Sequence, residues 1–232
     1  MGRPLRITGP NLPFHILNRG NARQEVFRDK KDFEYYLKLI KRYKKEFQFK
    51  LFHFVLMSNH VHFQMEPTID GSISKIMQRL TLAHTWYFNK KYHSVGHVWQ
   101  GRFKSALIDK ENYFLHCGLY IELNPVRAGL VKRPEDWAFS SYNFYAQGRT
   151  EPVIKEILDS DPFYLELGDS VGERQKNYRE GVEAAMKENS LKIIRRKLDE
   201  GVFGGDDFVR KMKEKYKIGS LQNRGRPRKE EK

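Results

Sequence analysis

Apolar residues along this chain repeat with two periods, and each period predicts a different kind of element. Short runs rich in β-branched and aromatic residues predict strands. One such run, residues 49–66, predicts two strands joined by a tight turn at residues 57–59. The expected strands are residues 14–18, a hairpin over residues 49–66, and residues 98–108. Helical spacing predicts helices at residues 30–47, 72–91 and 110–124. Asp29 is a suitable cap for the first helix, and Pro125 is expected to stop the third.

The order of these elements predicts an α+β fold. The first six match the split βαβ arrangement of ferredoxin-like folds, an antiparallel sheet with helices on one face. After residues 146–149 the chain becomes more charged, with helical patterns at residues 153–160, 172–189, 190–200 and 206–216. We therefore expect a main domain over residues 1–148, a helical extension over 149–220 and a basic tail over 221–232. The last two helices outline a helix-turn-helix, although charged helix pairs are common.

The charge balance narrows the partners. The chain has 232 residues and a formal net charge of +14, which favours polyanions, nucleic acid first and an anionic membrane second. No apolar run approaches the roughly 20 residues of a membrane-spanning helix, and the N-terminus lacks the apolar stretch of a secretory signal. The single cysteine, Cys117, fits a reducing compartment. We therefore expect a cytoplasmic protein without a membrane partner.

The most informative residues are His60 and His62, in the second arm of the hairpin. Residues two apart in a strand point to the same face, so the two imidazoles should lie side by side. Two neutral imidazoles make half of a divalent metal site. The simpler alternative is a pair of ordinary polar-face histidines beside a turn.

Tyr120 and Asn124 lie four residues apart on the third predicted helix and share one of its faces. Packing for the tyrosine and helix termination for the asparagine are ordinary alternatives. Beside two histidines, however, a carboxamide oxygen suits a hard cation such as Mg²⁺ or Mn²⁺, and a tyrosine can attack an electrophile polarised by that cation. With one cysteine, a closed zinc site is less attractive. His116 is a candidate proton acceptor, with packing the simpler role.

Three segments resemble a known family: SNHVHFQ at residues 58–64, WQGRFKS at 99–105 and YIELNPVRAGLV at 120–131. Together, in this order, they resemble the IS200-like single-tyrosine transposases of the HUH superfamily, and within them the REP-associated tyrosine transposases. The resemblance covers roughly residues 1–145 and continues more loosely through residues 203–212.

The resemblance implies roles for the candidate residues. His60 and His62 would bind the metal, Tyr120 would be the nucleophile, and Asn124 would replace a third ligand that is often Gln in the wider family. It also implies an enzyme that cuts single-stranded DNA, forms a 5′-phosphotyrosine and releases a 3′-OH, acting on short palindromes that fold into hairpins. Such a protein would work as a monomer or a homodimer.

Several basic residues are candidate DNA contacts. Arg102 and Lys104 are two apart on a predicted strand and would face one way, either toward phosphates or toward solvent. Arg19 and Gly20 could let a phosphate approach backbone N–H groups, or form a plain turn. In the tail, a Gly-Arg-Pro core resembles an AT-hook that enters an A·T-rich minor groove, or a solubilising extension. The arginines concerned are Arg224, Arg226 and Arg228.

Three rival functions stay open. The first is a non-catalytic, domesticated protein that binds hairpin DNA with the same fold. The second is a replication or conjugation nickase of the same superfamily, which the segments at 99–105 and 124–131 fit less well. The third is a metal phosphodiesterase that uses water and would not need Tyr120.

Overall fold

The computed structural model describes residues 7–69, 72–187 and 190–218. Its strands are β1 (Phe14–Arg19), β2 (Phe49–Met57), β3 (His60–Pro67), β4 (Lys104–Ile108) and β5 (Val202–Phe203). Its first helices are α1 (Lys30–Phe47), α2 (Ser72–Tyr92), α3 (Phe114–Glu122), α4 (Asn124–Arg127) and α5 (Tyr142–Gln147). The later ones are α6 (Pro152–Ile157), α7 (Pro162–Leu165), α8 (Val171–Lys187), α9 (Ser190–Asp199) and α10 (Asp206–Lys215). Two short 3-10 turns are η1 (Asn21–Arg23) and η2 (Pro134–Asp136).

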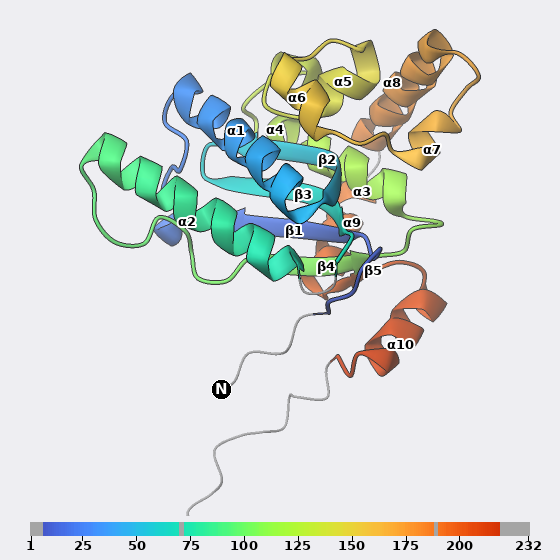
Figure 1. Ribbon diagram of the computed structural model, residues 1–232. Helices are drawn as coiled ribbons and strands as arrows, with labels where there is room; N and C mark the ends of the chain where they lie inside the picture. Colours follow the sequence, from blue (N-terminus) through green and yellow to red (C-terminus); the bar gives the residue numbers. More distant parts are fainter. Residues whose placement is uncertain (1–6, 70–71, 188–189, 219–232) are drawn as a thin grey trace, which may run out of the picture.

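The strands form one sheet in the order β2-β3-β1-β4-β5. The first four are antiparallel and have the expected ferredoxin-like order, so the predicted α+β class is confirmed. The fifth strand pairs parallel to β4 and makes the sheet mixed. Helices α1 and α2 cover one face, as expected, whereas α3 and α9 lie behind the sheet in Figure 1. The sheet is therefore sandwiched between two helical layers.

Strands β2 and β4 form further backbone hydrogen bonds with segments outside the four antiparallel strands. On the β2 side, the Leu56 N–H donates to the Phe139 carbonyl at 2.9 Å and the Asp159 N–H donates to the Leu51 carbonyl at 2.8 Å. On the β4 side, the Leu107 N–H donates to Gly201 at 3.0 Å and the Asp109 N–H donates to Phe203 at 2.7 Å. The segments that follow η2, α6 and α9 are thus joined to the sheet by main-chain hydrogen bonds.

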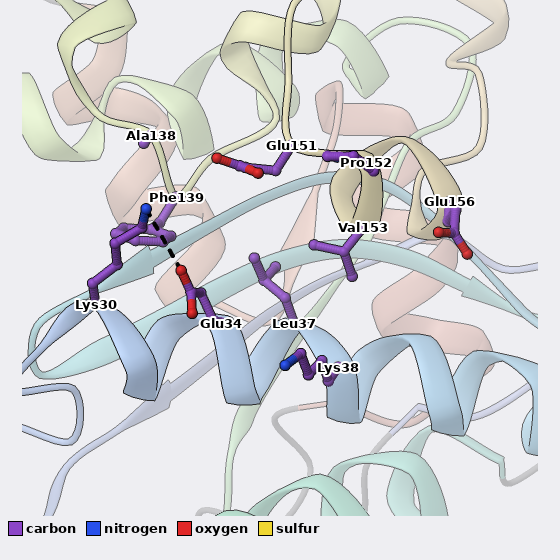
Figure 2. Close-up of a pocket in the computed structure, with 10 residues that line it drawn as sticks. All are labelled: Lys30, Glu34, Leu37, Lys38, Ala138, Phe139, Glu151, Pro152, Val153 and Glu156. Carbon is purple, nitrogen blue, oxygen red and sulfur yellow. Dashed lines mark ion pairs between the residues drawn. The ribbon is translucent and has the colours of Figure 1, made fainter.

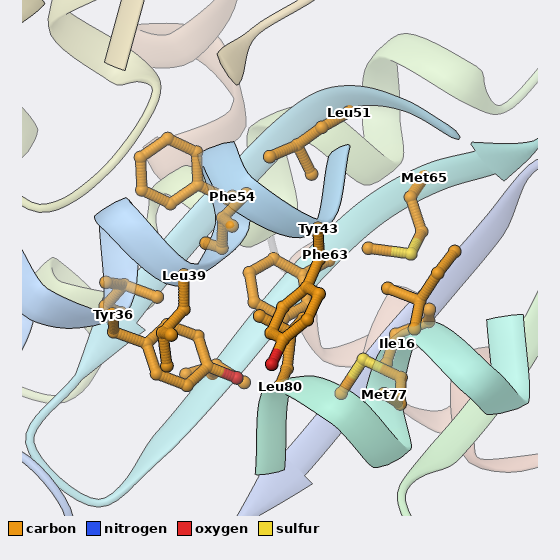
Figure 3. Packing of buried hydrophobic residues seen from close by; sticks show 14 of the residues in the cluster. Ile16, Tyr36, Leu39, Tyr43, Leu51, Phe54, Phe63, Met65, Met77 and Leu80 are labelled. Carbon is orange, nitrogen blue, oxygen red and sulfur yellow. The ribbon is translucent and has the colours of Figure 1, made fainter. Parts of the chain in front are cut away.

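Helix α1 begins and ends as the sequence predicts. The Asp29 carboxylate accepts a hydrogen bond from the Asp32 N–H, and the Asp32 carboxylate accepts one from the Asp29 N–H, a complete capping box. Gln48 adopts a left-handed conformation that ends the helix. The apolar side of α1 packs with α2 on β1 and β3, where Figure 3 shows Tyr36, Phe63 and Met77 among the packed side chains.

Strand alternation separates two buried clusters. Ile16 and Phe63 belong to the cluster under α1 and α2. Their neighbours in sequence point the other way, toward the cluster that contains α3 and the C-terminal helices. In the β1–β3 register, Leu17 lies opposite His62 and Arg19 lies opposite His60. The histidine pair therefore belongs to the face covered by α3.

Two predicted elements have wrong boundaries. The strand expected at residues 98–108 begins only at Lys104, because Gly101 turns the chain with φ +54° and Trp99 forms an isolated bridge with Gly20 instead. The helix expected at residues 110–124 begins only at Phe114 and ends at Glu122, and the chain then resumes as α4, with Pro125 in its first turn. Proline fits there because the N–H it lacks has no intrahelical acceptor.

The segment after residue 149 is helical, as expected, but it also supplies β5 between α9 and α10. A strand rather than a plain turn thus joins the two helices of the predicted helix-turn-helix, and a DNA-reading role for them stays a prediction. Across the described residues, no helix combines the length and apolarity that crossing a membrane requires.

Candidate active site

The structure brings His60, His62 and Tyr120 into one cluster. The two histidine rings of β3 are 5.0 Å apart between centroids and nearly perpendicular. Helix α3 carries Tyr120, whose ring centroid lies 6.0 Å from that of His62. The spatial convergence that the sequence pattern suggests is thus present in the fold.

A third histidine, His15 of β1, completes the cluster. Its Nε2 lies 2.8 Å from Nδ1 of His62, and its ring centroid is 5.9 Å from that of Tyr120. Sequence analysis missed this residue because a single histidine within an apolar strand carries no spacing signal. By contrast, His116, the proton-acceptor candidate, is exposed and lies beside Tyr113.

Hydrogen bonds leave one nitrogen of each hairpin histidine available. The Asn59 amide donates to the Arg23 carbonyl at 3.3 Å, which turns its oxygen toward His60 Nδ1 at 2.5 Å. An amide oxygen only accepts, so His60 carries its proton on Nδ1 and keeps the Nε2 lone pair. In His62, Nδ1 faces Nε2 of His15 at 2.8 Å, and the tautomer in which His62 Nδ1–H donates to His15 keeps the Nε2 lone pair of His62. Such a contact to the second ring nitrogen is how proteins orient a metal-binding imidazole.

Burial keeps these imidazoles neutral. Desolvation lowers the pKa of His60 to about 4 and that of His15 to about 3. It also lowers the pKa of His62 well below its ordinary value, with further lowering from neighbouring charges such as Arg19 and Arg127. At neutral pH all three rings are uncharged, which is the form that binds a metal ion.

Tyr120 is only 4% exposed and packs in the apolar cluster on this face. The guanidinium carbon of Arg127 lies 4.8 Å from the centre of its ring. Arg127 is exposed and comes from α4, so the continuation of the helix past Pro125 is what places this cation over the phenol. Ile194 and Leu198 of α9 are buried in the same cluster, which puts α9 over this part of the sheet.

The Asn124 side chain terminates α3. Its amide nitrogen donates to the carbonyl of Tyr120 at 2.8 Å and to that of Ile121 at 3.1 Å. These bonds fix the amide orientation and leave the oxygen as the atom able to accept another partner. The contacts therefore show directly that Asn124 terminates the helix, which is one of the two alternatives for this residue.

A buried polar network lies directly beneath α3. Glu122, two residues after Tyr120, accepts hydrogen bonds from His53 Nδ1 at 2.9 Å, Ser141 Oγ at 2.5 Å and the Tyr178 hydroxyl at 2.6 Å. His53 Nε2 lies 2.9 Å from an Asp161 carboxylate oxygen. Against desolvation, which lowers it, the bonds to Asp161 and Glu122 raise the pKa of His53 to about 9. His53 is thus a buried imidazolium between two carboxylates.

The candidate phosphate contacts have different surroundings. The N–H of Gly20 donates to Asn59 and that of Asn21 to Val98, both at 2.8 Å, so these backbone groups are already used. Gly20 instead permits close packing, because a Cβ there would lie 2.3 Å from the Gln24 carbonyl oxygen. Arg102 lies in an exposed bend before β4, so the shared strand face predicted for it and Lys104 is wrong.

The remaining basic candidates are partly described. Lys104 is exposed and pairs with Asp199 at 2.9 Å. Arg19 is half-buried in β1 opposite His60. The tail arginines Arg224, Arg226 and Arg228 lie outside the described residues.

Two cavities open elsewhere on the molecule. One of about 380 Å³ lies between α1 and residues 138–156, and Figure 2 shows Leu37, Phe139 and Val153 in its apolar wall with Glu34, Glu151 and Glu156 around it. The other, of about 470 Å³, lies between α2 and the loop before β4. Neither is lined by the histidine pair or Tyr120.

Known proteins match both the sequence and the fold. The family model of IS200-like transposases matches residues 9–124. A REP-associated tyrosine transposase solved with a REP hairpin has a similar fold, with a TM-score of 0.54, 22% identity, and coverage of 66% of this chain and 90% of that one. A protein described as a candidate transposase from Deinococcus radiodurans R1 aligns with a TM-score of 0.37 and 17% identity over 53% of this chain and 95% of that one. No curated protein matches the chain significantly.

The matched residues span half of the chain and contain the histidine pair and Tyr120. The family match and the fold thus define a transposase-like protein of the α+β class. The chain belongs to the family of IS200-like transposases.

Proposed function

We propose that this protein is a metal-dependent endonuclease and strand transferase that acts on single-stranded DNA at a hairpin. Its nucleophile is the Tyr120 hydroxyl, and the product of cleavage is a 5′-phosphotyrosine with a free 3′-OH. The observation that carries this proposal is the meeting of two neutral imidazoles from β3 with the Tyr120 phenol from α3.

The donor set fits a divalent metal ion such as Mg²⁺ or Mn²⁺. Among the described residues no hydrogen bond uses Nε2 of His60 or His62, and the Asn124 amide oxygen would be the further oxygen donor. Within the described residues, no three His, Cys, Asp or Glu side chains are grouped to hold a metal, so the set depends on Asn124 and on oxygens of the DNA. When bound, such an ion supplies Lewis-acid stabilisation of charge on the scissile phosphate.

The protein's own residues account for the remaining steps. The Tyr120 oxygen attacks the phosphorus and gives up its proton to water, the bond from phosphorus to the 3′-oxygen breaks, and that oxygen takes a proton from water and leaves as a 3′-OH. Arg127, over the Tyr120 ring, supplies a positive charge close to the attacked phosphate. His15 holds the His62 ring in place through Nδ1.

The DNA substrate that we assign is supported by the net charge of the chain and by the similar fold of a solved transposase. A net charge of +14 favours a polyanion. The REP-associated transposase of similar fold was solved with a REP hairpin, and we assign a hairpin of this kind to the present chain. We place the reaction in the cytoplasm, with the protein acting as a monomer or homodimer.

The decisive experiment is incubation with a single-stranded hairpin oligonucleotide and Mn²⁺, followed by a denaturing gel. A covalent protein–DNA band should form with the wild type and with Tyr113→Phe, a control at the start of α3, but not with Tyr120→Phe. A band that persists in Tyr120→Phe would refute the assignment of the nucleophile. Cleavage without any band in that variant would point to a hydrolase instead.

A non-catalytic hairpin-binding protein is the second candidate, favoured by the 4% exposure of Tyr120. The histidine variants separate the two. His60→Ala should abolish cleavage and leave hairpin affinity intact if the site is catalytic. Tight hairpin binding by a wild type that never forms the covalent band would support the second candidate.

A further inference from the structure

The outer face of α2 is unusual for a surface helix because its large apolar residues point into solvent. Trp86 is 64% exposed and Leu82, one turn before it, is 61% exposed. Arg79 and Lys90 continue the same stripe at helical spacing. The Lys90 ammonium lies 5.0 Å from the centre of the Trp86 ring. An exposed indole beside a cation, on a helix face that carries further positive charge, is an arrangement that proteins use to stack on unpaired bases.

The charged residues in α2 and in the segment after it, through β4, are all positive. Residues 71–108 contain no aspartate or glutamate, and they contain six lysines and arginines: Lys75, Arg79, Lys90, Lys91, Arg102 and Lys104. Lys91 is neutralised by Asp29 and Asp32, and Lys104 pairs with Asp199. The α2 stripe itself still presents Lys75, Arg79 and Lys90. A polyanion is therefore the complementary partner.

The second cavity lies alongside this stripe. Its volume of about 470 Å³ is within the range of roughly 300–1,000 Å³ typical of small-ligand sites. Its described lining includes Leu82 together with the polar side chains of Gln78, Thr85, Asn21 and His97, and no carboxylate. Amides and hydroxyls can both donate to and accept from the edges of a base. The cavity of Figure 2, with three glutamates, has the opposite character.

This cavity lies at the same end of the sheet as the histidine pair. Asn21, in its wall, follows two residues after Arg19, which lies opposite His60. The Gly20 N–H donates to the carbonyl of Asn59, next to His60, and Gly20 bridges to Trp99, which also lines the cavity. In Figure 1 the tip of β1 and the β2–β3 turn meet at this end. The histidine pair lies on the other face of the sheet, so a DNA strand that leaves it reaches the face of α2 by passing around this end of the sheet.

We propose that the α2 stripe and its cavity bind unpaired DNA that flanks the hairpin. One base stacks on Trp86, an adjacent base enters the cavity, and Arg79 and Lys90 contact the phosphates between them. The role assigned to the flanking strand rests on the proposed function. The binding of single-stranded DNA at this surface is measurable without any cleavage.

The test uses the full-length protein and an oligothymidylate of about 16 nucleotides, which forms no hairpin. Trp86→Ala should weaken binding roughly 5- to 150-fold, the loss expected for one base–aromatic stack. Trp86→Phe keeps a stacking ring and should restore most of the affinity. Leu130→Ala removes an equally apolar side chain that is 48% exposed elsewhere, and it should bind as the wild type does.

Two further measurements test whether the DNA contacts Trp86 and Arg79. Trp86 is the most exposed of the three tryptophans, since Trp99 is 6% exposed and Trp137 donates to the Leu56 carbonyl. Stacking should therefore quench the fluorescence of the wild type, and Trp86→Phe should lose that quenching. Arg79→Ala should reduce the salt dependence of binding by about 0.7 in the log–log slope if it contacts one phosphate.

The outcomes separate this proposal from the proposed function. Oligothymidylate binding that depends on Trp86 supports it even if Tyr120 proves inactive. Equal affinity of the wild type and Trp86→Ala, or quenching that survives in Trp86→Phe, would overturn it even if Tyr120 forms the covalent band. A change from dimer to monomer in Trp86→Ala without a change in DNA affinity would also overturn it, because the stripe would then be a self-association surface.

Discussion

Raising the pH should destabilise this protein through His53. The folded state holds the proton of His53 with a pKa of about 9, against an ordinary value of 6.5, because Asp161 and Glu122 bind both ring nitrogens. A raised pKa in the folded state gives stability that is complete below 6.5 and is lost as the pH rises through 9. The free energy of unfolding should therefore fall across that interval.

The structure sets the size of this fall. The gap between 6.5 and about 9, at 1.36 kcal/mol per pH unit, corresponds to about 3 kcal/mol. His53, Glu122 and Asp161 are fully buried, so solvent screening does not reduce the value. Below pH 6.5 the free energy of unfolding should instead rise with pH. Desolvation lowers the pKa of buried His84 to about 3, so protonation of this residue opposes folding. Stability should peak near pH 6.5.

Urea unfolding followed by circular dichroism from about pH 6 to about pH 10 measures this dependence. Glu122→Gln removes one of the two carboxylates, so it should cost about 3–5 kcal/mol near pH 6.5 and flatten the decline above it. Tyr178→Phe removes only a hydrogen bond to the same carboxylate, at about 1–3 kcal/mol, and should keep the decline. A wild-type protein whose stability is constant between pH 6.5 and 9 would refute the buried imidazolium.

Two further predictions concern α3 and its neighbours. Gly118→Ala should destabilise the protein by about 1–3 kcal/mol in thermal unfolding, because the added Cβ would lie 2.6 Å from the His53 ring. Gly181→Ala in α8 meets nothing within 4 Å and should stabilise by about 0.5–1 kcal/mol; the same sign for both glycines would contradict the packing described. Arg127→Ala should slow formation of the covalent band about tenfold, a loss of about 1.4 kcal/mol at the transition state, while changing stability by less than about 1 kcal/mol. An unchanged rate would remove Arg127 from the proposed mechanism.

Local signals in the sequence were sufficient for much of the fold. The cap at Asp29 and the apolar stripe after it placed α1 at its observed bounds. The period of two around Val61 correctly put His60 and His62 on one face. The strand expected from residue 98 failed because a conformation with positive φ at Gly101 is not visible in an apolar pattern.

The rest of the site depends on pairing between distant parts of the chain. His15 reaches His62 only through the register of β1 against β3, across 47 residues. Glu122 and Asp161 meet His53 across 69 and 108 residues, and no spacing rule connects them. Arg127 lies within a motif that the sequence did show, but its position over Tyr120 required the continuation of the helix past Pro125.

The short strand β5 has a consequence for how two copies of this chain could meet. An open strand at the border of a sheet offers a row of free N–H and C=O groups that templates pairing with another molecule. Here β5 occupies those groups at Leu107 and Asp109, while residues 139 and 159 occupy them along β2. Two molecules that pair along β2 would first have to displace residues 139 and 159, whereas at the other border the outer edge of β5 is only two residues long. Extended pairing between the sheets of two copies is therefore disfavoured at both borders.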